Sequence, residues 1–152
     1  MRPKREVVTR NGQTYFVTSN TAQRKAFFRH ERWAELFIAT LVGYRPDRFS
    51  LHEFVVMPDH FHVLITARDR LELAVQCIKG GFSFRARKEL GWSGEIWVAG
   101  FSDHRIRDDE DFAKHQRYIA KNPVEAGLVE AERDYPYSSA NGLWELDAIP
   151  RG

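Results

Sequence analysis

The chain has 152 residues, of which 43% are hydrophobic and 29% charged, and its formal net charge is +2. This length suits one domain, residues 1–152, that buries a core of its own, and the composition excludes disordered and fibrous classes. The single cysteine, Cys77, excludes an internal disulfide, and its apolar helical surroundings predict a buried thiol. No apolar run approaches the ~20 residues of a membrane helix, and no signal peptide follows the start.

Hydrophobic periodicity predicts strands and helices in alternation along the chain. The expected strands cover 14–21, 49–57, 60–66 and, broken near Gly100, 96–106. The expected helices cover 30–44, 71–90 and 109–122, the second being weakened by Gly80-Gly81. Because only the turn signal Pro58-Asp59 separates the two middle strands, we expect them to pair antiparallel. The order predicts an α+β fold: a ferredoxin-like antiparallel sheet with helices packed on it.

Two histidines stand out in the expected strand that follows this turn. His60 and His62 are two residues apart in an apolar run. Strand side chains alternate between faces, so both imidazoles point the same way, roughly 6 to 7 Å apart, and both can reach one metal ion. The same spacing also occurs by chance in many sheets.

The last expected helix carries a tyrosine beside positive charge. Asp108 is a plausible N-cap, and Pro123 is expected to end the helix at Asn122. Tyr118 and Asn122, four residues apart, lie on a narrow stripe with Asp111 and His115. This stripe separates an apolar face from a cationic face formed by Lys114, Arg117 and Lys121. The plainer interpretation is a half-buried tyrosine with a hydrated hydroxyl group and an asparagine that caps the helix.

Together these motifs resemble the single-tyrosine HUH transposases, specifically the REP-associated tyrosine transposases. The resemblance covers about residues 15–141 and rests on "VVMPDHFHVLI", "IKGGFS", "IWVAGFSDHRIRDDEDFAKHQRYIAKNPVEAGLV" and "YPYSSANG". The HUH tripeptide, a hydrophobic residue between two histidines, is His60-Phe61-His62. The tripeptide alone is a weak signal, whereas its combination with the preceding "MPDH" and the later "YIAKNPVEAGLV" is specific.

The resemblance implies an enzyme that cuts and rejoins single-stranded DNA through a covalent 5′-phosphotyrosine. It assigns the nucleophile to Tyr118 and the ligands of a divalent metal, Mg²⁺ or Mn²⁺, to His60, His62 and Asn122. Magnesium prefers oxygen ligands, so two imidazoles favour manganese at least as well. The family often has a histidine where this chain has Ala120. His115 is a candidate base for the tyrosine.

The implied partner is single-stranded DNA with imperfect hairpins, bound by a monomer or homodimer in the bacterial cytoplasm at the nucleoid. Candidate phosphate-binding cations are Arg2, Lys4, Arg5, Lys79, Arg85, Arg105, Arg107, Lys114, Arg117 and Lys121. His30 and His52 are expected at the surface or a sheet edge, and a structural role is expected for Asp103 and His104. Two alternatives stay open: a non-catalytic nucleic-acid-binding module on a ferredoxin-like sheet, and a metal-dependent hydrolase in which Tyr118 is only structural.

Overall fold

A four-stranded antiparallel sheet forms the centre of the structure, a computed structural model that describes residues 12–149. The strands are β1 (Thr14–Asn20), β2 (Phe49–Met57), β3 (His60–Ala67) and β4 (Ser102–Arg105). The helices are α2 (Glu31–Gly43), α3 (Leu71–Leu90) and α4 (Asp109–Glu125). Short 3-10 helices cover η1 (Ala22–Arg24), η2 (Phe27–Arg29), η3 (Glu132–Asp134) and η4 (Ser139–Asn141).

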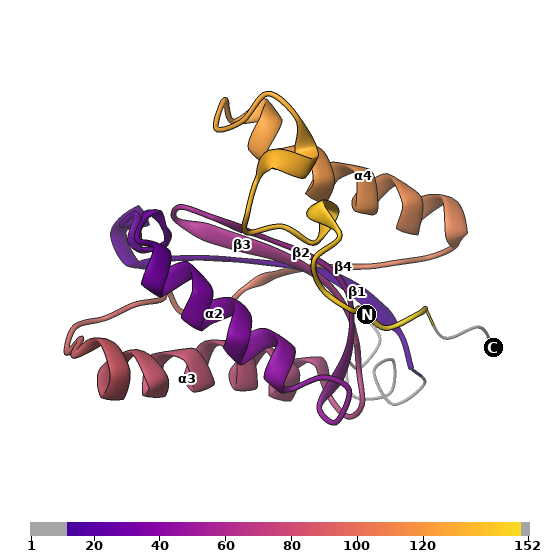
Figure 1. Cartoon of the computed structure of the whole chain (residues 1–152). Helices are drawn as coiled ribbons and strands as arrows, with labels where there is room; N and C mark the ends of the chain where they lie inside the picture. Colours follow the sequence, from indigo (N-terminus) through magenta and orange to yellow (C-terminus); the bar gives the residue numbers. More distant parts are fainter. Residues whose placement is uncertain (1–11, 150–152) are drawn as a thin grey trace.

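The strand order β2-β3-β1-β4 confirms the ferredoxin-like α+β prediction. Helices α2 and α3 cover one face of the sheet, and α4 covers the other face together with the segment that follows it (Figure 1). β3 is a central strand and is buried on both faces, which explains its nearly continuous apolar sequence.

Side-chain alternation along the strands divides the core into two layers. Val63 and Ile65 of β3 are fully buried in the layer that includes Phe37 of α2 and Phe82 of α3. The intervening Leu64 belongs to the smaller layer beneath α4, together with Phe112 and Ile119. The His60 and His62 positions share the parity of Leu64, so they face α4.

The two glycines of α3 do not interrupt it, since the helix is continuous from Leu71 to Leu90. A Cβ on Gly81 would collide with the ring and hydroxyl of Tyr44, whereas a Cβ on the neighbouring Gly80 would meet nothing within 4 Å. Gly81 therefore lets Tyr44 approach the helix closely. Cys77, predicted to be buried, is only partly buried, because it lies at the edge of the helix face that packs on the sheet.

His52 lies on the edge strand β2, as one of the two predicted places requires, but it is buried there and not at the surface. A register shift between Leu51 and Glu53 interrupts the pairing of β2 with β3. The imidazole of His52 bonds through Nδ1 to the carbonyl of Asp147 at 2.8 Å and through Nε2 to Thr66 Oγ1 at 2.8 Å. The C-terminal segment thus covers β2, an arrangement that the strand pattern alone does not predict. His30 is exposed, as expected.

The end of α4 was predicted wrongly. The helix continues through Pro123 to Glu125, with Ala126 as its C-cap, and Gly127 follows with φ of +75°. Phe112, Ile119 and Pro123 are its buried residues, so the proline ring extends the apolar face of the helix. This burial offsets the lost hydrogen bond, and the left-handed conformation of Gly127 supplies the actual stop.

No helix within residues 12–149 is both long and apolar enough to cross a membrane.

Candidate active site

His60 and His62 begin β3 on the face covered by α4. Their ring centroids are 4.9 Å apart, with an angle of 79° between the ring planes. The sequence-based expectation that both imidazoles lie together on one face of the sheet is therefore confirmed. What each ring nitrogen contacts determines what the pair can bind.

His62 is held at one nitrogen and left open at the other. Its Nδ1 lies 2.7 Å from Thr18 Oγ1, directly across the β1–β3 pair, and the ring of Phe16 stacks on it at 5.2 Å. Its Nε2 is buried and has no hydrogen-bond partner among the described residues. Burial, followed by the charge of His60, lowers the pKa of His62 to about 3. The imidazole is therefore neutral at physiological pH and can offer Nε2 as a metal ligand.

His60 is held by a carboxylate in the same way. Its Nδ1 lies 2.7 Å from Asp59 Oδ1, while Arg24 donates from Nε to Asp59 Oδ2 at 3.0 Å. Burial acts to raise the pKa of the Asp59 carboxyl, but hydrogen bonds from His60 and Arg24 outweigh burial and lower it. Because both histidines are held at Nδ1, both have Nε2 left for one ion, and the Asp59–His60 pair is an arrangement common in metal sites.

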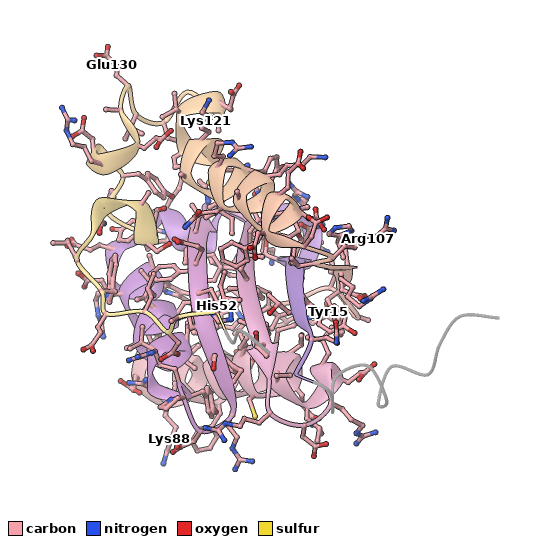
Figure 2. All side chains as sticks on the ribbon, turned by 90° about the vertical axis from the view of Figure 1, so that its right-hand side faces the viewer. Tyr15, His52, Lys88, Arg107, Lys121 and Glu130 are labelled. Carbon is pink, nitrogen blue, oxygen red and sulfur yellow. The ribbon has the colours of Figure 1, made fainter. Side chains whose placement is uncertain are left out.

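Helix α4, which carries Tyr118, crosses this face of the sheet between the labelled Arg107 and Lys121 (Figure 2). The Tyr118 ring centroid is 5.3 Å from that of His62 and 5.8 Å from that of Phe16, with both contacts close to edge-on. The side chain is 51% exposed, so its hydroxyl is open to a substrate.

Asn122 is one helical turn beyond Tyr118 and is half-buried. It is not the helix cap, because its carbonyl accepts a hydrogen bond from Ala126 N at 3.0 Å inside the helix. Within the described part of the chain its side-chain amide has no hydrogen-bond partner. The amide is thus free to act as a third ligand, as an amide oxygen does for hard cations.

Three residues that support the site were missed from the sequence: Thr18, Asp59 and Phe16. Asp59 had a signal, since it immediately precedes His60. Thr18 and Phe16 had none, because 44 residues separate Thr18 from His62, and only the strand register brings them together.

The predicted phosphate-binding cations separate into different groups. Lys114, Arg117 and Lys121 are exposed on α4 and have no ion pair among the described residues, and Arg105 and Arg107 are exposed beside the start of α4. Lys79 lies on α3, across the sheet, and donates to the carbonyls of Val98 at 2.9 Å and Gly100 at 2.6 Å; burial lowers its pKa.

Arg85, also on α3, pairs with Glu89. Lys79 and Arg85 therefore lie on the face of the sheet opposite to α4 and Tyr118 (Figure 1). Arg2, Lys4 and Arg5 lie outside the described residues.

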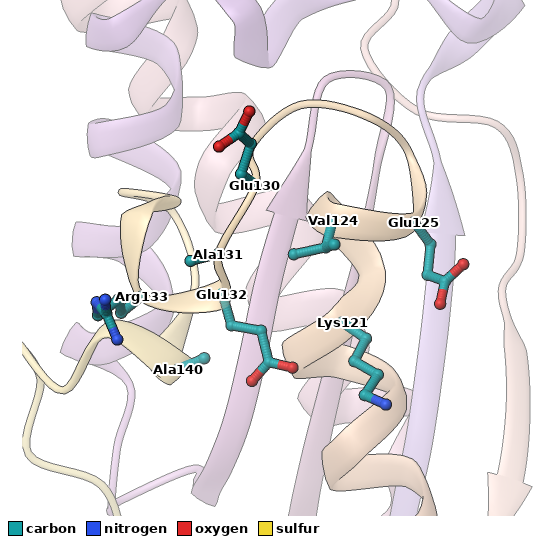
Figure 3. Close-up of a pocket in the computed structure, with 8 residues that line it drawn as sticks. All are labelled: Lys121, Val124, Glu125, Glu130, Ala131, Glu132, Arg133 and Ala140. Atoms are coloured by element: carbon teal, nitrogen blue, oxygen red, sulfur yellow. The ribbon is translucent and has the colours of Figure 1, made fainter.

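A hollow of about 500 Å³ adjoins the end of α4 (Figure 3). Three carboxylates, Glu125, Glu130 and Glu132, line it together with Lys121 and Arg133. Lys121 is the member of the cationic row of α4 that reaches this hollow, and the excess of carboxylates around it disfavours phosphate there.

The sequence profile of the family described as "Transposase IS200 like" matches residues 10–122. The match includes both histidines, Tyr118 and Asn122. The chain belongs to this family. The earlier resemblance to tyrosine transposases is thereby confirmed.

This IS200-like transposase is 28% identical over 144 residues to a REP-associated tyrosine transposase of Escherichia coli K12, covering 90% of this chain and 84% of that protein. It is 35% identical over 103 residues to a Haemophilus influenzae protein described as a REP-associated tyrosine transposase. This second match covers 60% of this chain and 58% of that protein.

Solved structures agree with the fold. A REP-associated tyrosine transposase bound to a REP hairpin superimposes with a TM-score of 0.72 at 28% identity, covering 92% of this chain and 87% of that one. A Deinococcus radiodurans protein described as a transposase superimposes with a TM-score of 0.53 at 23% identity, covering 70% of this chain and 87% of that one. The second likeness shows the fold alone.

Proposed function

We propose that this transposase cleaves and rejoins single-stranded DNA, with Tyr118 as the nucleophile and His60, His62 and Asn122 as ligands of one divalent cation. The observation that carries the proposal is the contact between Tyr118 and His62. An exposed phenol lies with its ring centroid 5.3 Å from that of a buried histidine, whose Nε2 is left without a hydrogen bond.

The donor set fits Mn²⁺ or Mg²⁺. Two neutral imidazoles and an amide oxygen add no negative charge to the site and leave coordination positions open. When bound, the cation neutralises charge on the scissile phosphate and orients its phosphorus for attack. Thr18 and Asp59 keep the two histidine rings turned so that Nε2 of each is available.

The covalent step follows from the chemistry of tyrosine. Tyr118 Oη loses its proton and attacks the phosphorus, an O–P bond forms, and the bond from phosphorus to the 3′ oxygen breaks. The 3′ oxygen takes up a proton and leaves as a hydroxyl, while the 5′ phosphate remains on Tyr118. Attack by a 3′-hydroxyl on this phosphotyrosine reverses the step without ATP, because the phosphodiester energy is retained in the new bond.

The exposed cations of α4 support an anionic substrate beside Tyr118. Lys114, Arg117 and Lys121 form a row on the helix that carries the nucleophile. Phosphate contacts of this kind make binding weaken as salt rises. One similar protein was solved with a REP hairpin, and we propose hairpin-bearing single strands as the substrate here. The matched relatives are bacterial, so chromosomal DNA in the cytoplasm is the proposed setting.

The test is formation of a covalent adduct. Wild-type protein with Mn²⁺ or Mg²⁺ and a labelled single-stranded hairpin library should give a denaturation-resistant protein–DNA adduct. Tyr118→Phe should abolish the adduct while hairpin binding and melting temperature stay unchanged, because only one exposed oxygen is removed. The same sequences as perfect duplexes are the control and should not be cut.

Two results would separate the alternatives. Hairpin binding without any wild-type adduct indicates a binding module that has lost catalysis. Cleavage that persists in Tyr118→Phe indicates a hydrolase in which the tyrosine is structural.

A further inference from the structure

A second group of ligand-type side chains gathers where β4 meets the start of α4. His104 Nε2 lies 2.9 Å from Asp111 Oδ2, and His115 Nδ1 lies 3.2 Å from Asp111 Oδ1. One ligand atom from each residue can be chosen so that all three lie within 4.8 Å of one another. We propose that His104, Asp111 and His115 form a second divalent-metal site that takes a zinc-type transition ion and is separate from the His60–His62 site.

The spacing of the donor atoms fits one ion. Ligand atoms about 2.1 Å from an ion stand about 3.0 Å apart on an octahedral edge and about 3.4 Å apart on a tetrahedral edge. The distance of 2.9 Å from His104 Nε2 to Asp111 Oδ2 is close to an octahedral edge, and His115 Nδ1 lies 3.2 Å from the other carboxylate oxygen, Oδ1. Without an ion, His104 Nε2 is hydrogen-bonded to the Asp111 carboxylate, whereas His115 Nδ1 donates to the backbone carbonyl of Asp111 at 2.9 Å. Binding of an ion therefore replaces the proton on His104 Nε2 and requires the His115 ring to give up its bond to the carbonyl.

The donor types select the class of ion. Two imidazoles and one carboxylate, with further positions open to water, are a set typical of Zn²⁺ and related ions, whereas Mg²⁺ prefers oxygen ligands. Burial acts to raise the pKa of Asp111, but hydrogen bonds from His104 and the Arg107 amide outweigh burial and lower it, so the carboxylate is charged. The exposed side-chain fractions are 40% for His104, 17% for Asp111 and 15% for His115, so an ion reaches them without unfolding.

The surrounding structure holds the three side chains before any ion binds. The two imidazoles stack with centroids 4.7 Å apart and planes 20° from parallel. The backbone amide of Arg107 donates to Asp111 Oδ2 at 3.0 Å, and Asp108 caps the Asp111 amide at 2.7 Å. Because the ligands are already oriented, little conformational entropy is lost when an ion is bound.

Phe16 separates the two sites. Its ring stacks on that of His62 with centroids 5.2 Å apart, and its centroid also lies 4.8 Å from that of the His115 ring. An ion at the second site joins β4 to α4 one helical turn before Tyr118. We therefore expect it to stabilise the position of the helix that carries the nucleophile relative to the sheet.

The experiment counts zinc ions in the full-length protein by native mass spectrometry and measures their affinity by competition with a chelator. The double variant His60→Ala/His62→Ala removes the first site and should still bind one Zn²⁺. Adding His104→Ala, or separately His115→Gln, should lower the affinity for this remaining Zn²⁺ by about 10-fold or more. His30→Ala in the same background removes an exposed histidine and should leave the affinity unchanged. Circular dichroism checks that each variant is folded.

The proposal is overturned if the double variant binds no Zn²⁺, or if neither added substitution lowers the affinity of the double variant for Zn²⁺. Cobalt substitution gives a second readout that does not depend on affinity. The visible spectrum of Co²⁺ in the double variant should change when His115→Gln removes a nitrogen ligand, and an unchanged spectrum counts against the site. These results do not depend on cleavage, so the second site and the proposed function can fail independently.

Discussion

His62 combines deep burial with an unpaired ring nitrogen. It is 5% exposed, and its Nε2 has no hydrogen-bond partner among the described residues. Leaving a buried polar atom unpaired costs about 1–3 kcal/mol. Binding of a cation to Nε2 would offset this cost, and the neighbouring His60 and Tyr118 support this role.

A first residue-scale prediction concerns Thr18. Thr18→Val keeps the shape of the side chain but removes the hydroxyl that lies 2.7 Å from His62 Nδ1. Because the ring is then free to change tautomer and orientation, affinity for Mn²⁺ should fall about 10- to 100-fold. Calorimetric titration measures it, and Thr18→Ser, which retains the hydroxyl, should restore wild-type affinity. Equal affinities for the valine variant and the wild type would contradict a positioning role.

Asn122 leads to a second prediction at this scale. If its amide oxygen is a ligand, Asn122→Ala should raise the Mn²⁺ concentration for half-maximal cleavage about 10-fold or more. Asn122→Asp should remain active, because a carboxylate also binds hard cations. Cleavage measured across a metal titration distinguishes the variants. An unchanged metal requirement in Asn122→Ala would remove this residue from the site and leave a two-histidine centre.

At the scale of elements, the catalytic function depends on how α4 packs on the sheet. The buried residues Phe112, Ile119 and Pro123 hold the helix by one face. Tyr118 and Asn122 project from the boundary of that face, and Lys114, Arg117 and Lys121 lie on the exposed side. One amphipathic pattern therefore positions the proposed nucleophile, a candidate ligand and the cationic surface together.

In helix α3, substitution of the adjacent Gly80 and Gly81 by alanine should change stability in opposite directions, so each variant is a control for the other. Gly80→Ala should raise the free energy of unfolding by about 0.5–1 kcal/mol, since alanine favours the helix and its Cβ meets nothing within 4 Å. Gly81→Ala has the same helical preference, but its Cβ collides with Tyr44, so stability should fall below that of the wild type. Urea unfolding of both variants measures the difference. Equal effects would mean that Tyr44 moves aside without cost.

At the scale of the whole molecule, the C-terminal segment closes the open edge of the sheet. Val56 N donates to the carbonyl of Tyr137 at 2.8 Å, and Asp147 N donates to that of Leu51 at 2.8 Å. These bonds satisfy backbone groups of β2 that an edge strand otherwise leaves exposed. His52 joins this segment to the sheet, which makes the stability of the whole fold depend on its protonation.

The pH dependence of folding stability follows from the burial of His52. Burial lowers the pKa of this histidine despite the opposing effects of Asp147 and Glu53. The unfolded chain therefore binds this proton more readily than the folded one. The contribution of neutral His52 to the free energy of unfolding is therefore complete above the usual histidine pKa near 6.5 and is lost as pH falls below it.

His52→Gln should reduce the loss of unfolding free energy between pH 7 and pH 5, by at most about 1.4 kcal/mol per pH unit. Denaturant melts at each pH give the slopes, and His30→Gln is the exposed control. Identical slopes for His52→Gln and wild type would refute the assignment. His62 is present in all three proteins, so its own contribution cancels in the comparison.

The sequence by itself determined the order of elements, the common face of His60 and His62, and the stripe of α4 that carries Tyr118 and Asn122. These features depend on local periodicity, which side-chain geometry converts directly into faces of a strand or helix. The same periodicity could not locate the end of α4, because burial of the Pro123 ring outweighed the local preference against helix.

Only the tertiary structure decided which distant residues meet. Thr18 contacts His62 through the register of two strands, His52 is buried by a segment some 95 residues further along, and Lys79 binds the carbonyls of a loop across from its helix. Strand register and helix packing are set by the whole core at once, so no short stretch of sequence specifies these contacts.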